Sequence, residues 1–305
     1  MSISPSITSS YAGEFAGKYL AASLLTAKTI DDGAITVLPN IKFKAAMKVG
    51  AFSNLIKNAS CGFDESSSTL ALTEKVLTPK ELQVNIDICK KDLHSDWEAA
   101  QMGFSAFDEL PPLFSDFVIS RVAAEVASAT ESNIWSGTDT DGNFAGFKTQ
   151  INADGNRTLV TATDVTSANV VAEIGKVVDA IPAGVYGSED LYIYCAQNVF
   201  KAYIRALGGF AATNSGVDAK SHTFYSGGEL SFDGVKLYPT SGIGANEMVA
   251  ARSSNLFFGT GLLNDYNEVR VLDMAELDGS QNVRVIMRYT AGTQIGVGSD
   301  IVLYT

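Results

Sequence analysis

The chain has 305 residues, a length typical of about two domains. Hydrophobic residues make up 46% of it, which is ordinary for a globular protein and argues against a disordered one. The net charge of −12 argues against sequence-specific nucleic-acid binding, which needs a basic surface. No stretch approaches the roughly 20 apolar residues that cross a bilayer, so we expect no membrane partner.

Patterns typical of catalysis are missing from the sequence. The histidines His94 and His222 lie far apart, and neither is part of an H-E-x-x-H zinc motif. There is no G-x-S-x-G nucleophile elbow and no phosphate-binding P-loop. Gly259 and Gly261 match only the start of a dinucleotide fingerprint, and we interpret them as a turn after a strand over 256–258. We therefore expect no enzyme and no cofactor.

Metal binding is not indicated either. Residues 139–143 place side-chain oxygens at positions 1, 3 and 5 of a calcium loop. The pattern then fails, because Phe144 stands where the loop needs glycine and Gln150 where it needs a bidentate Glu. Asp and Gly in this order predict a turn. The three cysteines are widely separated and form no C-x-x-C pair: Cys61, Cys89 and Cys195.

The first 80 residues predict two extended features that need partners. Residues 1–42 contain aromatic and small residues at helical spacing, followed by a strand over 34–38 that Pro39 ends. This arm lacks the apolar surface for a core of its own. Residues 43–80 predict a long two-stranded excursion with a polar tip at 61–68, and such a ribbon is marginal alone.

The middle of the chain predicts a strand and a long helix. In residues 82–88 the apolar side chains alternate strictly with polar ones, as in a half-buried strand. A helix is expected over about 92–107. Pro111 and Pro112 then open a helix over about 113–134, with apolar side chains four residues apart: Phe114, Val118, Val122 and Val126.

The second half predicts a mixed unit followed by strands, so the fold class is α+β. We expect helices over 167–181 and 197–206, and strands over 191–195, 235–238, 248–251 and 256–258. The C-terminal part predicts three strands, over 269–272, 283–289 and 293–304.

This order of elements resembles the major capsid protein of tailed bacteriophages, which has the Hong Kong 97-like fold. The resemblance covers essentially the whole chain. Several local patterns carry it, and their specificity lies in their order and spacing together: Ile134 to Phe147, Leu191 to Leu207, Phe232 to Tyr238, Asn255 to Gly259 and Val283 to Tyr304.

The resemblance implies a division into the parts of that fold. These are an N-terminal arm (1–42), an E-loop hairpin (43–80), a P-domain (81–157) with its spine helix at 113–134, an A-domain (158–264), P-domain return strands (265–292) and a closing strand (293–305). The family's E-loop lies over a neighbouring subunit, so the charged residues at its end become candidates for intersubunit ion pairs: Glu74, Lys75, Lys80 and Glu81.

The resemblance also implies a structural function. The chain is expected to self-assemble as pentamers and hexamers into an icosahedral shell around double-stranded DNA, with only non-specific proximity to that DNA. Its location would be the virion, and the host cytoplasm during assembly. Scaffolding, portal and decoration proteins are further candidate partners. Lys75 and Lys80 alone do not identify the Lys–Asn cross-link of one subgroup, so we assign none.

Two alternatives stay open at the level of sequence. Bacterial encapsulins share the fold but enclose cargo enzymes. An α+β enzyme with an unrecognised site would instead stay a monomer or small oligomer and would need a concave pocket with perturbed pKa values.

Overall fold

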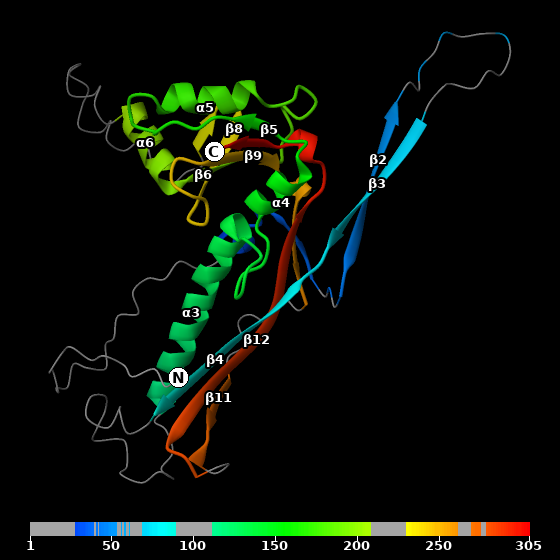
Figure 1. Ribbon diagram of the computed structural model, residues 1–305. Coiled ribbons are helices and arrows are strands. Elements are labelled where there is room, and N and C mark those ends of the chain that lie inside the picture. Colours follow the sequence, from blue (N-terminus) through cyan, green and yellow to red (C-terminus); the bar gives the residue numbers. More distant parts are fainter. Residues whose placement is uncertain are drawn as a thin grey trace.

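The computed structural model describes residues 28–39, 41, 43–53, 56, 58, 61, 69–89, 112–208, 230–261, 270–275 and 279–305. They form a five-stranded sheet, a six-stranded sheet, a long helix and a projecting two-stranded hairpin (Figure 1). The helix expected over 92–107, the helical spacing in the first 27 residues and both histidines lie outside the described residues.

The five-stranded sheet is organised around β12 (Asn282–Ile295). Strand β4 (Lys80–Cys89) runs antiparallel along residues 282–291 of β12. The opposite edge of β12 pairs first with β11 (Arg270–Asp273) and then with β10 (Leu256–Thr260). The short β1 (Thr36–Leu38) joins β10 in parallel and ends this sheet.

The predicted alternation in this sheet is confirmed. Leu82 on β4 is buried, and three of its successors pack against the same core: Val84, Ile86 and Ile88. Opposite them, β12 buries Val283, Val285, Met287 and Tyr289, whereas Arg284 and Arg288 between them are exposed. One face of the sheet is therefore apolar, and the side-chain period of two in a strand is the reason.

Helix α3 (Pro112–Ser136) lies along this apolar face (Figure 1). It begins at the predicted proline and extends two residues beyond the predicted end. Val122 and Val126 are buried in the core that the helix shares with the sheet. At its C-terminal end the Trp135 ring packs 5.3 Å from that of Phe147, in α4 (Phe147–Asp154), and 4.8 Å from that of Tyr194.

The six-stranded sheet forms the second unit. Two helices, α5 (Val170–Asp179) and α6 (Gln197–Gly208), pack against one face (Figure 1). Its other face contributes Tyr194, Val249 and Leu303 to the core around Trp135. The strands follow in spatial order: β5 (Thr158–Val160), β13 (Val302–Tyr304), β9 (Met248–Arg252), β6 (Leu191–Ala196), β8 (Val235–Thr240) and β7 (Leu230–Phe232).

Helix α5 is shorter than the predicted 167–181. The Asn169 carboxamide oxygen accepts from the backbone N–H of Thr166 at 2.7 Å and from its hydroxyl at 3.1 Å. This local side-chain bonding holds residues 166–169 in a turn and competes with helix, as Asn commonly does. The helix therefore starts only at Val170.

The prediction of one strand over 293–304 is wrong. Strand β12 ends at Ile295, and after a 3-10 turn (Gly298–Asp300) the chain enters the other sheet as β13. Asn255, in the 3-10 turn Ser253–Asn255, forms this corner. Its side chain accepts from Val297 N–H at 2.7 Å and donates to Val297 C=O at 2.8 Å. Both backbone groups of Val297 therefore bond to Asn255 and not to a neighbouring strand.

The hairpin and the N-terminal segment complete the fold. Strands β2 (Ala45–Ser53) and β3 (Thr69–Leu77) pair antiparallel and project from the body (Figure 1). The segment before β1 forms one helical turn, α1 (Lys28–Asp31). The expected two-stranded excursion is confirmed, although most of its predicted tip lies outside the described residues.

We expect Gly137→Ala to destabilise the protein strongly. A Cβ at Gly137 would lie 2.1 Å from the carbonyl oxygen of Phe144 and 2.6 Å from that of Asn133, so backbone would have to move. Forced overpacking of this kind costs about 1–3 kcal/mol or more in unfolding free energy. Urea unfolding measures the change.

The matched control is Gly175→Ala, inside α5, where a Cβ would meet nothing within 4 Å. Alanine should there leave stability unchanged or raise it by up to about 1 kcal/mol, because glycine is a poor helix former. Equal effects of the two substitutions would contradict the close packing at Gly137.

Candidate assembly surface

The hairpin presents one fully exposed face. Cross-strand partners in an antiparallel pair share a face, and the register pairs Ala46 with Val76, Lys48 with Glu74 and Gly50 with Leu72. All six residues are exposed, and the exposed fraction is 66% for Leu72 and 39% for Val76. We call these six residues the outer face of the hairpin.

The outer face has no cover within the described part of the chain. A two-stranded ribbon has no second layer to bury its apolar residues, and an isolated one is marginal in water. Burying one leucine or valine side chain stabilises a complex by about 1.5–3 kcal/mol before ordering costs. Burial of Leu72 and Val76 against another surface would therefore stabilise a complex made through this face.

The root of the hairpin, in contrast, is firmly attached to the body. Leu77, the last residue of β3, is fully buried. It fits there because Gly259 on β10 has no side chain, and a Cβ at Gly259 would lie 2.5 Å from Leu77 Cδ2. Gly259 was predicted to form a turn, but β10 continues through it to Thr260, so that interpretation is wrong.

Two polar contacts hold β3 to the body. The Lys75 ammonium forms an ion pair with the Asp154 carboxylate at the end of α4. The Gln294 amide on β12 donates to the backbone carbonyl of Val76 at 2.9 Å. Both contacts lie within two residues of Leu77, so they fix the direction in which the hairpin leaves the body.

Lys80, the first residue of β4, is held by the turn that resembles the start of a calcium loop. Its ammonium donates to the carbonyls of Thr140 at 2.7 Å and Asn143 at 2.9 Å, and lies 3.4 Å from Asp139 Oδ1. The turn prediction is confirmed, because Asp139 and Gly142 both adopt positive φ. The lysine supplies the positive charge to which these oxygens point.

The four candidate charges thus divide into two pairs. Lys75 and Lys80 make contacts inside the subunit, at the hairpin root. Glu74 and Glu81 are exposed, and neither side chain has a hydrogen bond or ion pair within the described residues. The role of all four at subunit interfaces stays a prediction.

The sequence reasoning missed the apolar part of this surface. Leu72 and Val76 stand beside the charged residues Glu74 and Lys75, and the sequence prediction named only the charges. The signal was present, since Leu70, Leu72 and Val76 alternate with Ala71 and Thr73 along the strand. Alternation of this kind in an isolated hairpin indicates one apolar face.

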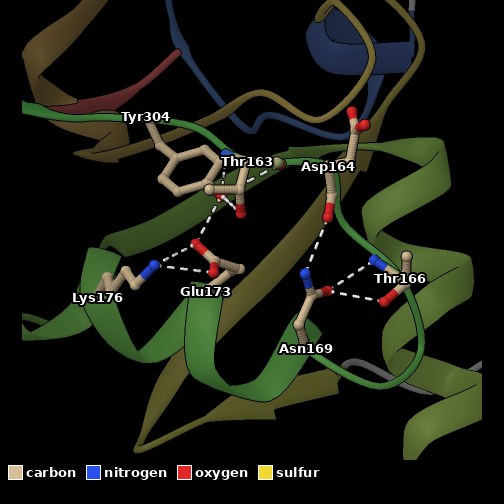
Figure 2. Close-up of polar contacts among 7 residues, drawn as sticks. All are labelled: Thr163, Asp164, Thr166, Asn169, Glu173, Lys176 and Tyr304. Carbon is tan, nitrogen blue, oxygen red and sulfur yellow. Dashed lines mark hydrogen bonds and ion pairs between the residues drawn. The ribbon is translucent and has the colours of Figure 1, made fainter.

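A buried polar cluster secures the C-terminal strand (Figure 2). The Tyr304 hydroxyl donates to Glu173 Oε2 at 2.8 Å and accepts from the Thr163 backbone N–H at 3.0 Å. Lys176 donates to both Glu173 oxygens, at 2.8 and 2.9 Å. Tyr304 is fully buried, so this cluster joins α5 to the last strand of the sheet.

The cluster keeps Glu173 ionised. The Lys176 ammonium is the largest cause that lowers the pKa of Glu173, burial of the carboxyl opposes it, and the Tyr304 hydroxyl lowers it further. A carboxyl whose pKa is lowered on folding stabilises the folded state above its unfolded pKa of about 4.3. That stabilisation is lost as the pH falls through the lowered, folded-state pKa.

Other kinds of site were sought among the same residues. In the ranges that the structure describes, no group of three or more His, Cys, Asp or Glu could hold a metal ion. None of the helices in these ranges is long and apolar enough to span a membrane.

Several solved structures share this fold, and two of those named below are described as capsids. The chain matches the capsid of the native GTA particle with a TM-score of 0.60 and 15% identity, over 92% of this chain and 90% of that chain. It matches the capsid of Myoviridae phage XM1 with a TM-score of 0.59 and 13% identity, over 91% of each chain. It also matches a structure of Mycobacterium phage Adephagia, with a TM-score of 0.59 and 14% identity, over 98% of this chain and 94% of that chain.

No protein-family model and no curated protein matches the sequence. The structural matches cover nearly the whole length of both partners. The expected α+β fold of tailed-phage capsid proteins is therefore confirmed.

We expect Tyr304→Phe to destabilise the protein by about 1–3 kcal/mol, because it removes the hydroxyl hydrogen bond to the buried, charged Glu173 carboxylate and the acceptor of the Thr163 N–H. The loss should be largest near pH 7 and should shrink at acidic pH, as the pH falls through the lowered pKa of Glu173. Urea unfolding at both pH values measures it.

Tyr186→Phe is the matched control. The Tyr186 side chain is half-exposed, and its hydroxyl donates to the Asp233 carbonyl at 2.8 Å, where water can replace it. Loss of this hydrogen bond should lower the free energy of unfolding by no more than about 0.5 kcal/mol, both near pH 7 and at acidic pH. A Tyr304→Phe effect that does not change with pH would contradict the link to Glu173.

Proposed function

We propose that this chain is the major capsid protein of a tailed, double-stranded DNA bacteriophage, and that it assembles as pentamers and hexamers into an icosahedral shell. The observation that carries the proposal is the exposed outer face of a rigidly rooted hairpin, on a subunit with the fold of capsid proteins. The function is mechanical containment, located in the virion after assembly in the host cytoplasm.

The coverage of the structural matches supports this proposal. About nine-tenths of each chain takes part, so the likeness extends over nearly the whole length and is not limited to a common core. The matched GTA capsid structure was computed with C5 symmetry, which fits a subunit that forms rings. Head-to-tail contacts between identical copies close into rings when the rotation allows.

The proposal includes the parts of the capsid fold, with changes to some boundaries. The N-terminal arm and the E-loop hairpin keep the boundaries expected from sequence, and the spine helix becomes α3, residues 112–136. Strand β10 was expected in the A-domain, but it pairs with β12, and β13 pairs with β5 and β9. We therefore assign β10 to the P-domain and residues 301–305 to the A-domain.

The first prediction is that the recombinant full-length chain forms closed shells tens of nanometres across, or rings of five or six subunits. Size-exclusion chromatography followed by negative-stain electron microscopy tests it. Shells that copurify with an enzyme cargo would favour an encapsulin. A chain that stays monomeric when concentrated and when co-expressed with candidate scaffolding proteins would favour the enzyme alternative.

The second prediction concerns the outer face of the hairpin. Leu72→Asp should abolish shells and rings while leaving the thermal unfolding of the subunit unchanged, because Leu72 is exposed in the subunit and would be buried only by a neighbour. Sedimentation velocity and circular dichroism measure the two properties.

Thr73→Asp is the control for the second prediction, since Thr73 is exposed on the same strand but points to the opposite face. It adds the same charge and should permit assembly. Normal shells from Leu72→Asp would overturn the assignment of the outer face as an interface.

A further inference from the structure

A buried carboxylate at the centre of the molecule receives only hydrogen-bond donors. Glu131 on α3 is 1% exposed. Its Oε2 accepts from the backbone N–H of Thr29 at 3.1 Å, and its Oε1 accepts from the hydroxyls of Thr29 and, at 2.9 Å, Thr240. No ion pair of Glu131 occurs within the described residues.

The neighbouring contacts leave both hydroxyls free to donate to Glu131. The Thr29 hydroxyl accepts from Trp135 Nε1–H at 3.2 Å, and the Thr240 hydroxyl accepts from Gly242 N–H at 3.1 Å. Each hydroxyl then keeps its own proton for Glu131. An ionised carboxylate only accepts, so its two oxygens satisfy both hydroxyls and the Thr29 N–H together, with hydrogen bonds that its charge strengthens.

Glu131 and two tyrosines of the six-stranded sheet hold the same segment. The Tyr238 hydroxyl donates to the Lys28 carbonyl at 3.2 Å and to Asp32 Oδ2 at 2.8 Å. The Tyr194 hydroxyl donates to the Ala34 carbonyl at 2.5 Å. Ile30, Ala34 and Ile35 are buried between these contacts. We call residues 28–38 the strap.

The strap covers an edge of the five-stranded sheet. Its residues 36–38 form β1 and pair with Phe257 to Gly259 of β10. Without β1, the backbone groups of β10 on that side would be unpaired, and an open edge of this kind is a template for pairing with another strand.

We propose that Glu131 is a positioning residue whose acceptor-only carboxylate seats the strap, and that the strap covers the β10 edge. Because Glu131 lies on the long helix and Thr240 on the six-stranded sheet, their contacts fix Thr29, at the start of the strap, against both elements. This inference concerns contacts inside one subunit, so it stands or falls independently of shell formation.

The Lys28–Thr29 peptide bond gives a direct readout, because both of its polar groups are engaged. The Lys28 carbonyl accepts from Tyr238, and the Thr29 N–H donates to Glu131. The Lys28 side chain is exposed, whereas Thr29 is fully buried. Trypsin can therefore cut after Lys28 only when the strap opens.

The experiment is limited trypsin digestion of the full chain, with each cut followed by mass spectrometry. In Glu131→Gln, neutral hydrogen bonds replace the charge-assisted ones to Thr29 and Thr240, and cleavage after Lys28 should accelerate about 10- to 100-fold. Cleavage after Lys201 and Arg205, on α6 in the other unit, should stay at the wild-type rate. Glu125→Gln, an exposed Glu on the same helix, is the matched control and should behave as wild type.

A second readout comes from Trp135, whose Nε1–H contacts the strap. In a Trp97→Phe background, the fluorescence emission of Trp135 should shift to longer wavelength in Glu131→Gln, because Thr29, the hydrogen-bond partner of Trp135, leaves its buried position. Should Glu131→Gln fail to fold, Thr240→Val removes one donor to Glu131 and Thr240→Ser restores it. Val should accelerate the Lys28 cut and Ser should not.

Two results would overturn the proposal. One is a folded Glu131→Gln protein in which the Lys28 cut and the Trp135 emission are unchanged. The other is a parallel acceleration of cleavage after Lys28, Lys201 and Arg205, which would show general destabilisation and no separate movement of the strap.

Discussion

Close backbone packing at the C-terminal end of α3 is the constraint on which the rest of the structure depends. Gly137 and Gly146 approach the helix end so closely that a Cβ at either would meet backbone atoms within 2.6 Å, and a Cβ at Gly242 would lie 2.2 Å from the Glu131 carbonyl. These approaches bring both sheets and α4 to one point. The Trp135 ring fills the space that remains, against Phe147 and Tyr194.

The rigidity of this junction gives meaning to the exposed hairpin. A flexible ribbon could fold back to hide Leu72 and Val76, at the cost of little more than loop entropy. Here the buried Leu77, the Lys75–Asp154 ion pair and the Lys80 contacts prevent that movement. The lysines near the hairpin therefore act inside the subunit to point it outward. The apolar outer face therefore stays exposed in the single subunit, where the proposed function places a neighbour.

Local patterns in the sequence predicted most elements, because hydrophobic period and turn chemistry are local properties. The alternation of Leu82 to Ile88 and the proline before α3 are examples, and the structure has both. The failures occurred where a distant residue decides the local structure. The strand over 293–304 is broken by the side chain of Asn255, and Gly259 stays in a strand because Leu77 packs on it.

The candidate site shows the same limit. Charges at 74–81 could be located by sequence, but not their partners, since Asp154 lies 79 residues from Lys75. Glu131 gave no signal at all, because one acidic residue in a long helix is indistinguishable from a solvated one until the donors converge on it. Thr29 and Thr240 come from opposite ends of the chain, 102 residues before and 109 after it.

This convergence explains how a fold can persist when identity is only 13–15%. Apolar positions tolerate exchange as long as volume and period are kept. The junction at the end of α3 needs glycine at a few positions and a hydrogen-bond acceptor at Glu131. It therefore tolerates far fewer substitutions, but it involves few residues. Under the proposed function, a shell subunit of this kind can vary over the parts of its surface that make no contacts. The hairpin root and the end of α3 must still hold the projecting parts at fixed angles, because identical copies close into a shell only if every subunit presents its contacts in the same direction.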